Sequence, residues 1–315
     1  MQTEFLISPG EQPKRLDIFL VNREPKLSRA AVQRMISAGR VRVNNQSAKP
    51  SQKIKPGDVV DLDKPKPTPL LINGQPSALE ILFEDSACLV INKPAGVAAH
   101  PGPGHWDDTL LNALLDHALR AGVVGMSGLV HRLDRDTSGV MVVAKTKTAH
   151  GRLAVQFEQH SITRQYEALV QGVPQHSHGR IELALGTDRN NVKRTSPHTL
   201  HPKASLTEYY VEEVFGAAAA HMVLTPRTGR THQIRAHLHA IGHPILGDPA
   251  YGAEPVRALE GYGVPRVMLH AYKLGFHHPL TGRYCEFTVK PPADFRGLSD
   301  ELRFKTVREG RGRTQ

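Results

Sequence analysis

The stretch "HRLDRDTSGVMVVAK", residues 131–145, joins a polar loop to a short apolar run. The apolar part, residues 140–143, has the length and composition of a strand buried inside a sheet. The Thr-Ser-Gly just before it is typical of a turn. Asp134 and Asp136 therefore lie in a predicted loop at the mouth of a sheet, where functional carboxylates are commonly placed.

Predicted strands and helices alternate around this loop. Leucines form one face of a predicted helix over residues 107–119, and a second helix is predicted over residues 147–160. Residues 205–215 and 220–229 have the pattern of two paired strands. Hairpin-like connections of this kind favour an α+β fold with a mixed, largely antiparallel sheet over a parallel βαβ arrangement.

The composition is that of a soluble globular protein. Of 315 residues, 39% are hydrophobic and 22% are charged, which excludes a disordered chain. The formal net charge of +10 favours a polyanionic partner, because neutralising phosphates releases counterions. Such a surplus also serves solubility, so the charge alone does not identify nucleic acid as the partner.

The sequence predicts neither a secreted nor a membrane protein. Cys88 and Cys285 lie far apart and form no C-x-x-C pair, so we expect no disulfide and no zinc ribbon. No signal peptide is visible, and no stretch approaches the roughly 20 apolar residues that cross a bilayer. We therefore expect a cytoplasmic protein and, because nothing marks an oligomer interface, a monomer.

Residues 15–63 form a compact α/β pattern of their own. Ser28 and Gly39 are suited to begin and end a helix whose apolar residues recur at i, i+3 and i+4. The "RVRV" of residues 40–43 alternates arginine with valine, as in a half-buried strand. Nearly all charges on the polar side have one sign, which favours contact with phosphates over an ordinary solvated surface. These basic residues are Lys26, Arg29, Arg34, Arg40 and Arg42.

A proline-rich stretch without periodicity is typical of a linker between two domains. We predict an N-terminal domain over residues 15–75, with its linker at residues 63–78. A catalytic domain is predicted over residues 79–295. Residues 296–315 are predicted to be a basic, flexible tail.

Asp134 lies between two arginines, Arg132 and Arg135. Neighbouring arginines favour an ionised carboxylate, and thus a nucleophile or base rather than a general acid. Asp136 is suited to a structural role, an Asx turn with the backbone that follows it. A glycosidase pair is disfavoured, because its carboxylates stand about 5 to 9 Å apart and usually come from separate elements.

The second polar region, "TGRTHQIRAHLHAIGHPILGDPAYG", spans residues 228–252. A helix is predicted from about Thr231, with Arg230 just before its first turn, where free backbone N–H groups attract anions. The region also contains four histidines, at positions 232, 237, 239 and 243. The H-E-x-x-H spacing is absent and no cysteine is near, so we expect no metal.

Five segments resemble the successive motifs of the RluA-type pseudouridine synthases: "INKPAGVAAHPG", "HRLDRDTSGVMVVAKT", "RQYEALV", "GRTHQIRAHL" and "HPILGDPAYG". The N-terminal module resembles the S4 RNA-binding domain, whose early Arg-Leu-Asp, Ser-Arg helix start and Gly-x-Val-x-Val-Asn are all present. The resemblance runs from about residue 15 to about residue 292. It points to the RluD-like branch, which isomerises uridines in large-subunit ribosomal RNA.

The resemblance implies a cofactor-free and metal-free reaction. The N1–C1′ bond of a uridine breaks, the base turns, and it is rejoined through C5. Asp134 is implied to be the nucleophile, with attack at C1′, attack at C6 and elimination from the sugar all left open. Tyr166 matches the family's active-site tyrosine, although by itself it is typical of a half-buried strand aromatic. Arg230 matches the arginine that pairs with the catalytic aspartate.

The resemblance also implies contacts with RNA. Arg132 is expected either to fill the gap left when the target base flips out or to clamp a phosphate. Further contacts are expected from His131, Arg135, Gln233 and Arg235. The second Arg-Leu-Asp, at residues 15–17, has no matching tyrosine nearby, so we interpret Asp17 as structural.

Three other functions fit parts of the sequence. A pseudouridine synthase acting on tRNA or another structured RNA would need the same site. A non-catalytic RNA-binding ribosome-assembly factor would lack Asp134, Tyr166 or Arg230, and all three are present. A metal hydrolase that used the four histidines would hold stoichiometric zinc.

Overall fold

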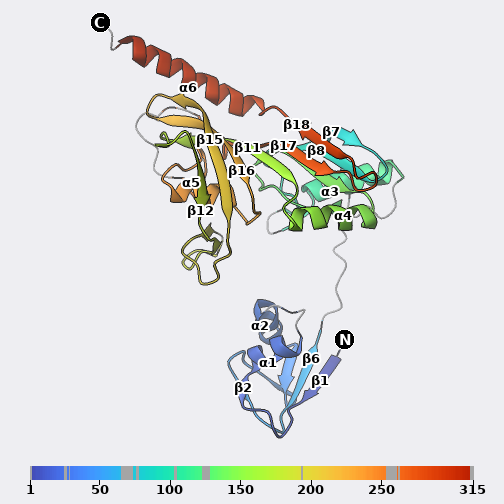
Figure 1. Cartoon of the computed structure of the whole chain (residues 1–315). Helices are drawn as coiled ribbons and strands as arrows, with labels where there is room; N and C mark the ends of the chain where they lie inside the picture. Colours follow the sequence, from blue (N-terminus) through green and yellow to red (C-terminus); the bar gives the residue numbers. More distant parts are fainter. Residues whose placement is uncertain are drawn as a thin grey trace. The chain divides into compact units, whose positions relative to one another are not determined.

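The structure is a computed structural model, and its chain divides into two compact units, Met1–Leu71 and Ile72–Gln315, each described by itself (Figure 1). The residues it describes are 2–24, 27, 29–64, 74–75, 78–102, 105–122, 128–192, 194–252, 261 and 263–312.

The N-terminal unit combines a four-stranded antiparallel sheet, in the order β1-β6-β3-β4, with two helices and the short pair β2–β5. Asn44 and Asn45 both have positive φ angles, as the two-residue hairpin between β3 and β4 requires. β1 pairs with β6 along its whole length, so this unit extends further toward the N-terminus than the sequence pattern predicts. The elements are β1 (Gln2–Leu6), β2 (Lys14–Arg15), α1 (Leu16–Arg23), α2 (Arg29–Ser37), β3 (Val41–Val43), β4 (Gln46–Ser47), β5 (Lys53–Ile54) and β6 (Val59–Asp63).

Asp17 is fully buried at the start of α1 and ties the two helices together. It accepts hydrogen bonds of 2.9–3.1 Å from the side chains of Arg15, Arg29 and Gln33. The bond from Arg15, helped by the other two residues, holds the pKa of Asp17 well below its ordinary value despite burial. The structural interpretation of Asp17 is confirmed.

The second unit is built on a ten-stranded sheet. Eight of its strands follow the order β12-β15-β16-β11-β17-β10-β8-β7, and the other two, β18 and β9, pair with β17 and β10. Among the described strands every pairing is antiparallel except β10 with β17, so the predicted α+β fold with a mixed sheet is confirmed. The elements up to the middle of the unit are β7 (Glu80–Glu84), β8 (Cys88–Lys93), α3 (Leu110–Arg120), β9 (Gly128–Leu129), β10 (Ser138–Ala144), α4 (Lys147–Glu158), β11 (Thr163–Gln171) and β12 (His178–Glu182). Those that follow are β13 (Gly186–Thr187), β14 (Thr195–Ser196), β15 (Leu206–Phe215), β16 (Ala219–Pro226), α5 (Gln233–Ala240), β17 (Leu269–His277), β18 (Tyr284–Thr288) and α6 (Ala293–Gly312).

Strand β10 is the apolar run predicted from residues 140–143, and every residue in it is buried. Its alternate side chains enter two different cores, one shared with Leu114 of α3 and the other with Leu153 of α4. Because alternate strand residues point to opposite faces, the two helices cover opposite faces of this part of the sheet. At Gly139, with φ 124°, a Cβ would clash with the Ala271 carbonyl, so glycine is required where β10 meets β17.

Helix α6 replaces the flexible tail predicted from residue 296. Phe295, Leu298 and Leu302 are buried in the core formed with β11, β15 and β16. As far as Leu302 the prediction of a flexible tail is wrong, because three apolar side chains at helical spacing give this basic segment a packed face. No described helix is both long and apolar enough to cross a membrane.

Candidate active site

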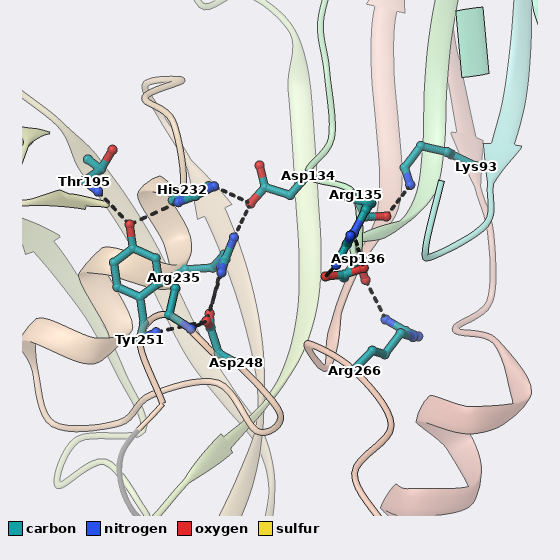
Figure 2. Close-up of polar contacts among 11 residues, drawn as sticks. Lys93, Asp134, Arg135, Asp136, Thr195, His232, Arg235, Asp248, Tyr251 and Arg266 are labelled. Carbon is teal, nitrogen blue, oxygen red and sulfur yellow. Dashed lines mark hydrogen bonds and ion pairs between the residues drawn. The ribbon is translucent and has the colours of Figure 1, made fainter. Parts of the chain in front are cut away.

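A buried lysine binds the backbone of the loop that carries Asp134. Lys93, at the end of β8, is completely buried, and its ammonium donates to the carbonyl oxygens of Pro94, Val97 and Arg135 at 2.7–3.0 Å. Figure 2 shows the bond to Arg135. Burial lowers the pKa of Lys93 to about 8, against the opposing charges of nearby aspartates. The loop is therefore fixed through its own backbone next to the carboxylate.

An arginine also binds the backbone of this loop. Arg266 donates to the carbonyl oxygen of Asp136 at 3.2 Å and pairs with Asp294 of α6 at 2.6 Å. The Asp136 carboxylate binds Arg135 at 3.1 Å rather than the backbone that follows it, so the expected Asx turn is not formed. The turn is closed instead by the Thr137 N–H, which donates to the carbonyl oxygen of Asp134.

Arg235, in the first turn of α5, bridges two carboxylates. Its Nη1 donates to Asp134 Oδ2 at 3.0 Å, and its Nε and Nη2 donate to the two oxygens of Asp248 at 2.7 and 2.9 Å. Burial opposes ionisation of both Arg235 and Asp248. Their mutual bonds prevail and hold the pKa of Arg235 above, and that of Asp248 below, the ordinary values. The guanidinium is thus a fixed cation beside Asp134.

His232 approaches Asp134 from just before α5. Its backbone is left-handed, with φ 52° and ψ 22°. Its Nε2 lies 3.7 Å from Asp134 Oδ2, and its Nδ1 lies 3.1 Å from the hydroxyl of Tyr251, which accepts a hydrogen bond from the Thr195 N–H at 2.7 Å. Burial lowers the pKa of His232, against the charge of Asp134, which favours the neutral ring.

Asp134 opens into a cavity of about 330 Å³. It is the only acidic residue among the described side chains that line this cavity, whereas Arg132, Arg164 and Arg230 all contribute to the lining. Tyr166 lies on β11 at a break in the register with β17, and burial raises the pKa of its hydroxyl. Among the described residues, the cavity therefore presents one carboxylate, the aromatic rings of Tyr166 and Phe157, and several cations.

Comparison with known proteins shows to which family the chain belongs. The RNA pseudouridylate synthase family model matches residues 87–240, and the S4 domain model matches residues 14–60. The chain is 38% identical to the uncharacterized RNA pseudouridine synthase YlyB of Bacillus subtilis, over 96% of this chain and 98% of that protein. This chain belongs to the RNA pseudouridine synthases.

Other relatives agree with this assignment. Ribosomal large subunit pseudouridine synthase D of Zymomonas mobilis is 41% identical over 90% of this chain and 92% of its own. The solved structures of human RNA pseudouridylate synthase domain containing 1 and 4 align with TM-scores of 0.57 and 0.59, at 29% and 26% identity. They cover 73% and 71% of this chain, and 97% and 93% of theirs. The protein is accordingly an isomerase with an N-terminal S4 domain.

The structure corrects one predicted contact in this pseudouridine synthase. Arg230 was expected to pair with Asp134, but its guanidinium donates to the carbonyl oxygen of Ala204 at 3.3 Å. Arg235 forms the ion pair with Asp134 instead. The left-handed residue His232 separates the two arginines, and the one inside the helix faces the loop of Asp134. Arg230 still lines the cavity.

Three residues predicted to contact RNA have partners within the chain. Arg235 and Gln233 are buried, and Gln233 bonds Thr228 and the Arg230 backbone. The His131 ring stacks on Phe157 and accepts a hydrogen bond from a backbone N–H of β10. Burial lowers the pKa of His131 to about 3, so it carries no charge for a phosphate.

The other predicted RNA contacts lie in several environments. Arg132 and Arg135 are exposed beside Asp134. In the S4 domain Arg34 and Arg42 are exposed, Arg29 is bound to Asp17, and Arg40 pairs with Asp63 at 3.4 Å. Lys26 and Ser28 lie outside the described residues.

Within the described residues, the four histidines of the 228–252 region form no group that could share a metal, although His232 and His239 both lie edge-on to the Tyr251 ring. His237 is buried against Ser205 and Thr207, His243 faces the carbonyl of Gln171, and His232 faces Asp134. Within the described part of the chain, the one group of side chains close enough to share a metal is Asp85, Cys88 and His278, none of which lines the cavity.

The sequence did not reveal the supporting residues of the site. Lys93 and Asp248 lie in the motifs "INKPAG" and "GDPAYG". A lysine or an aspartate in a motif does not by itself show whether its side chain is buried beneath the site or exposed on the surface. Tyr251 was likewise missed, although a tyrosine in a polar loop commonly finds a hydrogen-bond partner when buried.

Proposed function

We propose that this chain isomerises uridine to pseudouridine in RNA of the large ribosomal subunit, with Asp134 as nucleophile and without a cofactor. The observation that carries the proposal is the single carboxylate of the cavity, joined at 3.0 Å to a buried arginine that is itself fixed by Asp248. The ribosomal target is supported by the relatives named ribosomal large subunit pseudouridine synthase D, which are 36–41% identical.

The size of the cavity suits one nucleotide. A volume of about 330 Å³ lies at the lower end of the roughly 300–1,000 Å³ typical of ligand pockets, far too small for a base-paired helix. The target uridine therefore has to leave its stack before it reaches Asp134, at a cost of a few kcal/mol. Arg132 is exposed at the cavity and forms no hydrogen bond or ion pair within the described residues, so it is free to occupy the vacated position.

The reaction needs no external reagent. The N1–C1′ bond breaks and a C5–C1′ bond forms, while the proton lost from C5 is balanced by one gained at N1. Asp134 supplies the nucleophilic carboxylate, and Tyr166 provides a surface against which the detached base stays in place. Arg34 and Arg42 of the S4 domain are exposed and suited to contact phosphates of the same RNA.

The RNA target is tested by mapping pseudouridines in ribosomal RNA and tRNA from cells with and without the gene. We expect one or more pseudouridines of the large-subunit RNA to disappear and to return when the wild-type chain is supplied. An unchanged ribosomal pattern with losses confined to tRNA would contradict the ribosomal target.

A further inference from the structure

We propose that His232 is a positioning residue for Asp134, and that it determines which oxygen of the carboxylate reacts. This inference rests on the proposed role of Asp134 as nucleophile. It assigns a function to a histidine that the cavity contains but that the reaction above does not use.

The hydrogen bonds of Tyr251 determine the tautomer of His232. The Tyr251 hydroxyl oxygen accepts from the Thr195 N–H at 2.7 Å, and within the described residues His232 Nδ1 is the one acceptor near its proton, at 3.1 Å. The hydroxyl therefore donates to Nδ1, which leaves that nitrogen without a proton. In a neutral ring the proton must then lie on Nε2, the nitrogen that faces Asp134.

His232 and Arg235 both act on the same oxygen of Asp134. Figure 2 shows both side chains pointing to Oδ2, with Arg235 at 3.0 Å and His232 Nε2 at 3.7 Å, while Oδ1 points away from them. The separation of 3.7 Å exceeds a hydrogen bond, and such contacts commonly tighten when substrate binds. Two donors on Oδ2 hold the carboxylate in one orientation and leave the lone pairs of Oδ1 for the nucleotide.

The backbone gives independent support for a side-chain role. His232 occupies the N-cap of α5, where serine, threonine, aspartate and asparagine are preferred because their side chains bond the free N–H groups. Its ring makes no such cap bond, and its left-handed φ of 52° is a conformation that glycine adopts at lower cost. Helix formation therefore does not explain a histidine here, whereas its contacts with Tyr251 and Asp134 do.

The arrangement works only with a neutral ring. A proton added at Nδ1 would remove the acceptor of the Tyr251 hydroxyl and place a second full positive charge beside Asp134. The charged and titratable groups that face the ring are Asp134, Asp248, Arg132, Arg235 and Tyr251. Because Tyr251 donates to Nδ1, it disfavours protonation there, and its loss should allow His232 to protonate at higher pH.

Two substitutions at His232 separate positioning from mere packing. In His232→Gln the side-chain amide can present an N–H where Nε2 was, whereas in His232→Asn the shorter side chain cannot reach Asp134. We expect the single-turnover rate on uridine-containing RNA, followed by release of tritium from C5, to fall about 100-fold in His232→Asn. The rate of His232→Gln should stay within about tenfold of wild type. His176→Asn, at an exposed histidine between β11 and β12 that does not line the cavity, is the matched control and should retain the wild-type rate.

The pH profile provides a second readout that lost packing would not produce. In Tyr251→Phe the acid limb of the single-turnover rate should move to higher pH, because the neutral form of His232 is needed and protonates more readily. RNA affinity and thermal unfolding of each variant are measured alongside, so that a misfolded variant is recognised and the other substitution decides.

Equal rates for His232→Gln and His232→Asn, or an acid limb that does not move in Tyr251→Phe, would overturn the inference. Full activity of His232→Asn together with an inactive Asp134→Asn would refute the role of His232 alone. Full activity of Asp134→Asn would instead refute the proposed function itself.

Discussion

The Arg-Leu-Asp triplet occurs twice in this chain, and each aspartate has a different partner. Asp17 binds the arginine of its own triplet and is sealed inside the S4 domain. Asp134 leaves Arg132 exposed and binds Arg235, 101 positions further along the chain. The second triplet thus leaves its own arginine exposed, whereas the first binds its own arginine, and the same Asp17 joins the two helices through Arg29 and Gln33 of α2.

Arg235, rather than Arg230, should control the reactivity of Asp134. In Arg235→Lys a single ammonium cannot reproduce the planar fork that bonds Asp248 twice while reaching Asp134. We expect the single-turnover rate to fall roughly 100- to 1,000-fold with little change in RNA affinity. Arg230→Lys should have an effect at least about tenfold smaller, since it alters bonds to one carbonyl oxygen. Rates that fell equally in both variants would contradict the assignment.

At this scale the sequence predicts the kinds of residues in the site better than their contacts. Asp134 and Tyr166 were predicted from their motifs, and both line the cavity. Which of Arg230 and Arg235 pairs with Asp134 depends on the left-handed residue between them. The sequence pattern does not predict a histidine with a φ of 52°.

Among the elements, the S4 helices depend most directly on one side chain. Asp17→Ala removes the acceptor that Arg15, Arg29 and Gln33 share, and we expect it to destabilise this domain by about 3 kcal/mol, equivalent to one or two charge-assisted hydrogen bonds. Hydrogen exchange over residues 16–36 of the whole protein measures this loss. Exchange as slow as in wild type would contradict it.

The same carboxylate gives the S4 helices an acid-sensitive component. The folded pKa of Asp17 lies below its unfolded value, so its contribution is present above about pH 4 and is lost as the pH falls toward the folded value. The difference in exchange between wild type and Asp17→Ala should therefore shrink in acid.

Helix α6 shows what a local pattern does not capture at the scale of elements. Its sequence is basic and polar, which favoured a flexible tail, yet three apolar side chains dock on the sheet. Asp294, at its first turn, also binds the Arg266 that holds the Asp134 loop. The surface on which they pack is formed by β11, β15 and β16, more than 65 residues earlier in the chain, so a pattern within the tail does not reveal it.

For the whole molecule, the fold class was predictable because buried strands such as β10 show themselves as uninterrupted apolar runs. The assembly of the site was less predictable, because its residues come from separate elements and meet only in the folded chain. These residues are Lys93, Asp134, Arg235 and Asp248. What joins them in sequence is their membership of the family's motifs, which carries residue types but not hydrogen bonds.

The central claim is that Asp134 does the chemistry while the rest of the cavity holds the nucleotide. Its most direct test is the pseudouridine content of a large-subunit ribosomal RNA fragment after incubation with purified wild-type protein or Asp134→Asn. We predict that Asp134→Asn binds this RNA and unfolds like wild type, yet loses activity by on the order of 10⁴-fold or more. Conversion of uridine by Asp134→Asn at a rate near that of wild type would contradict the account.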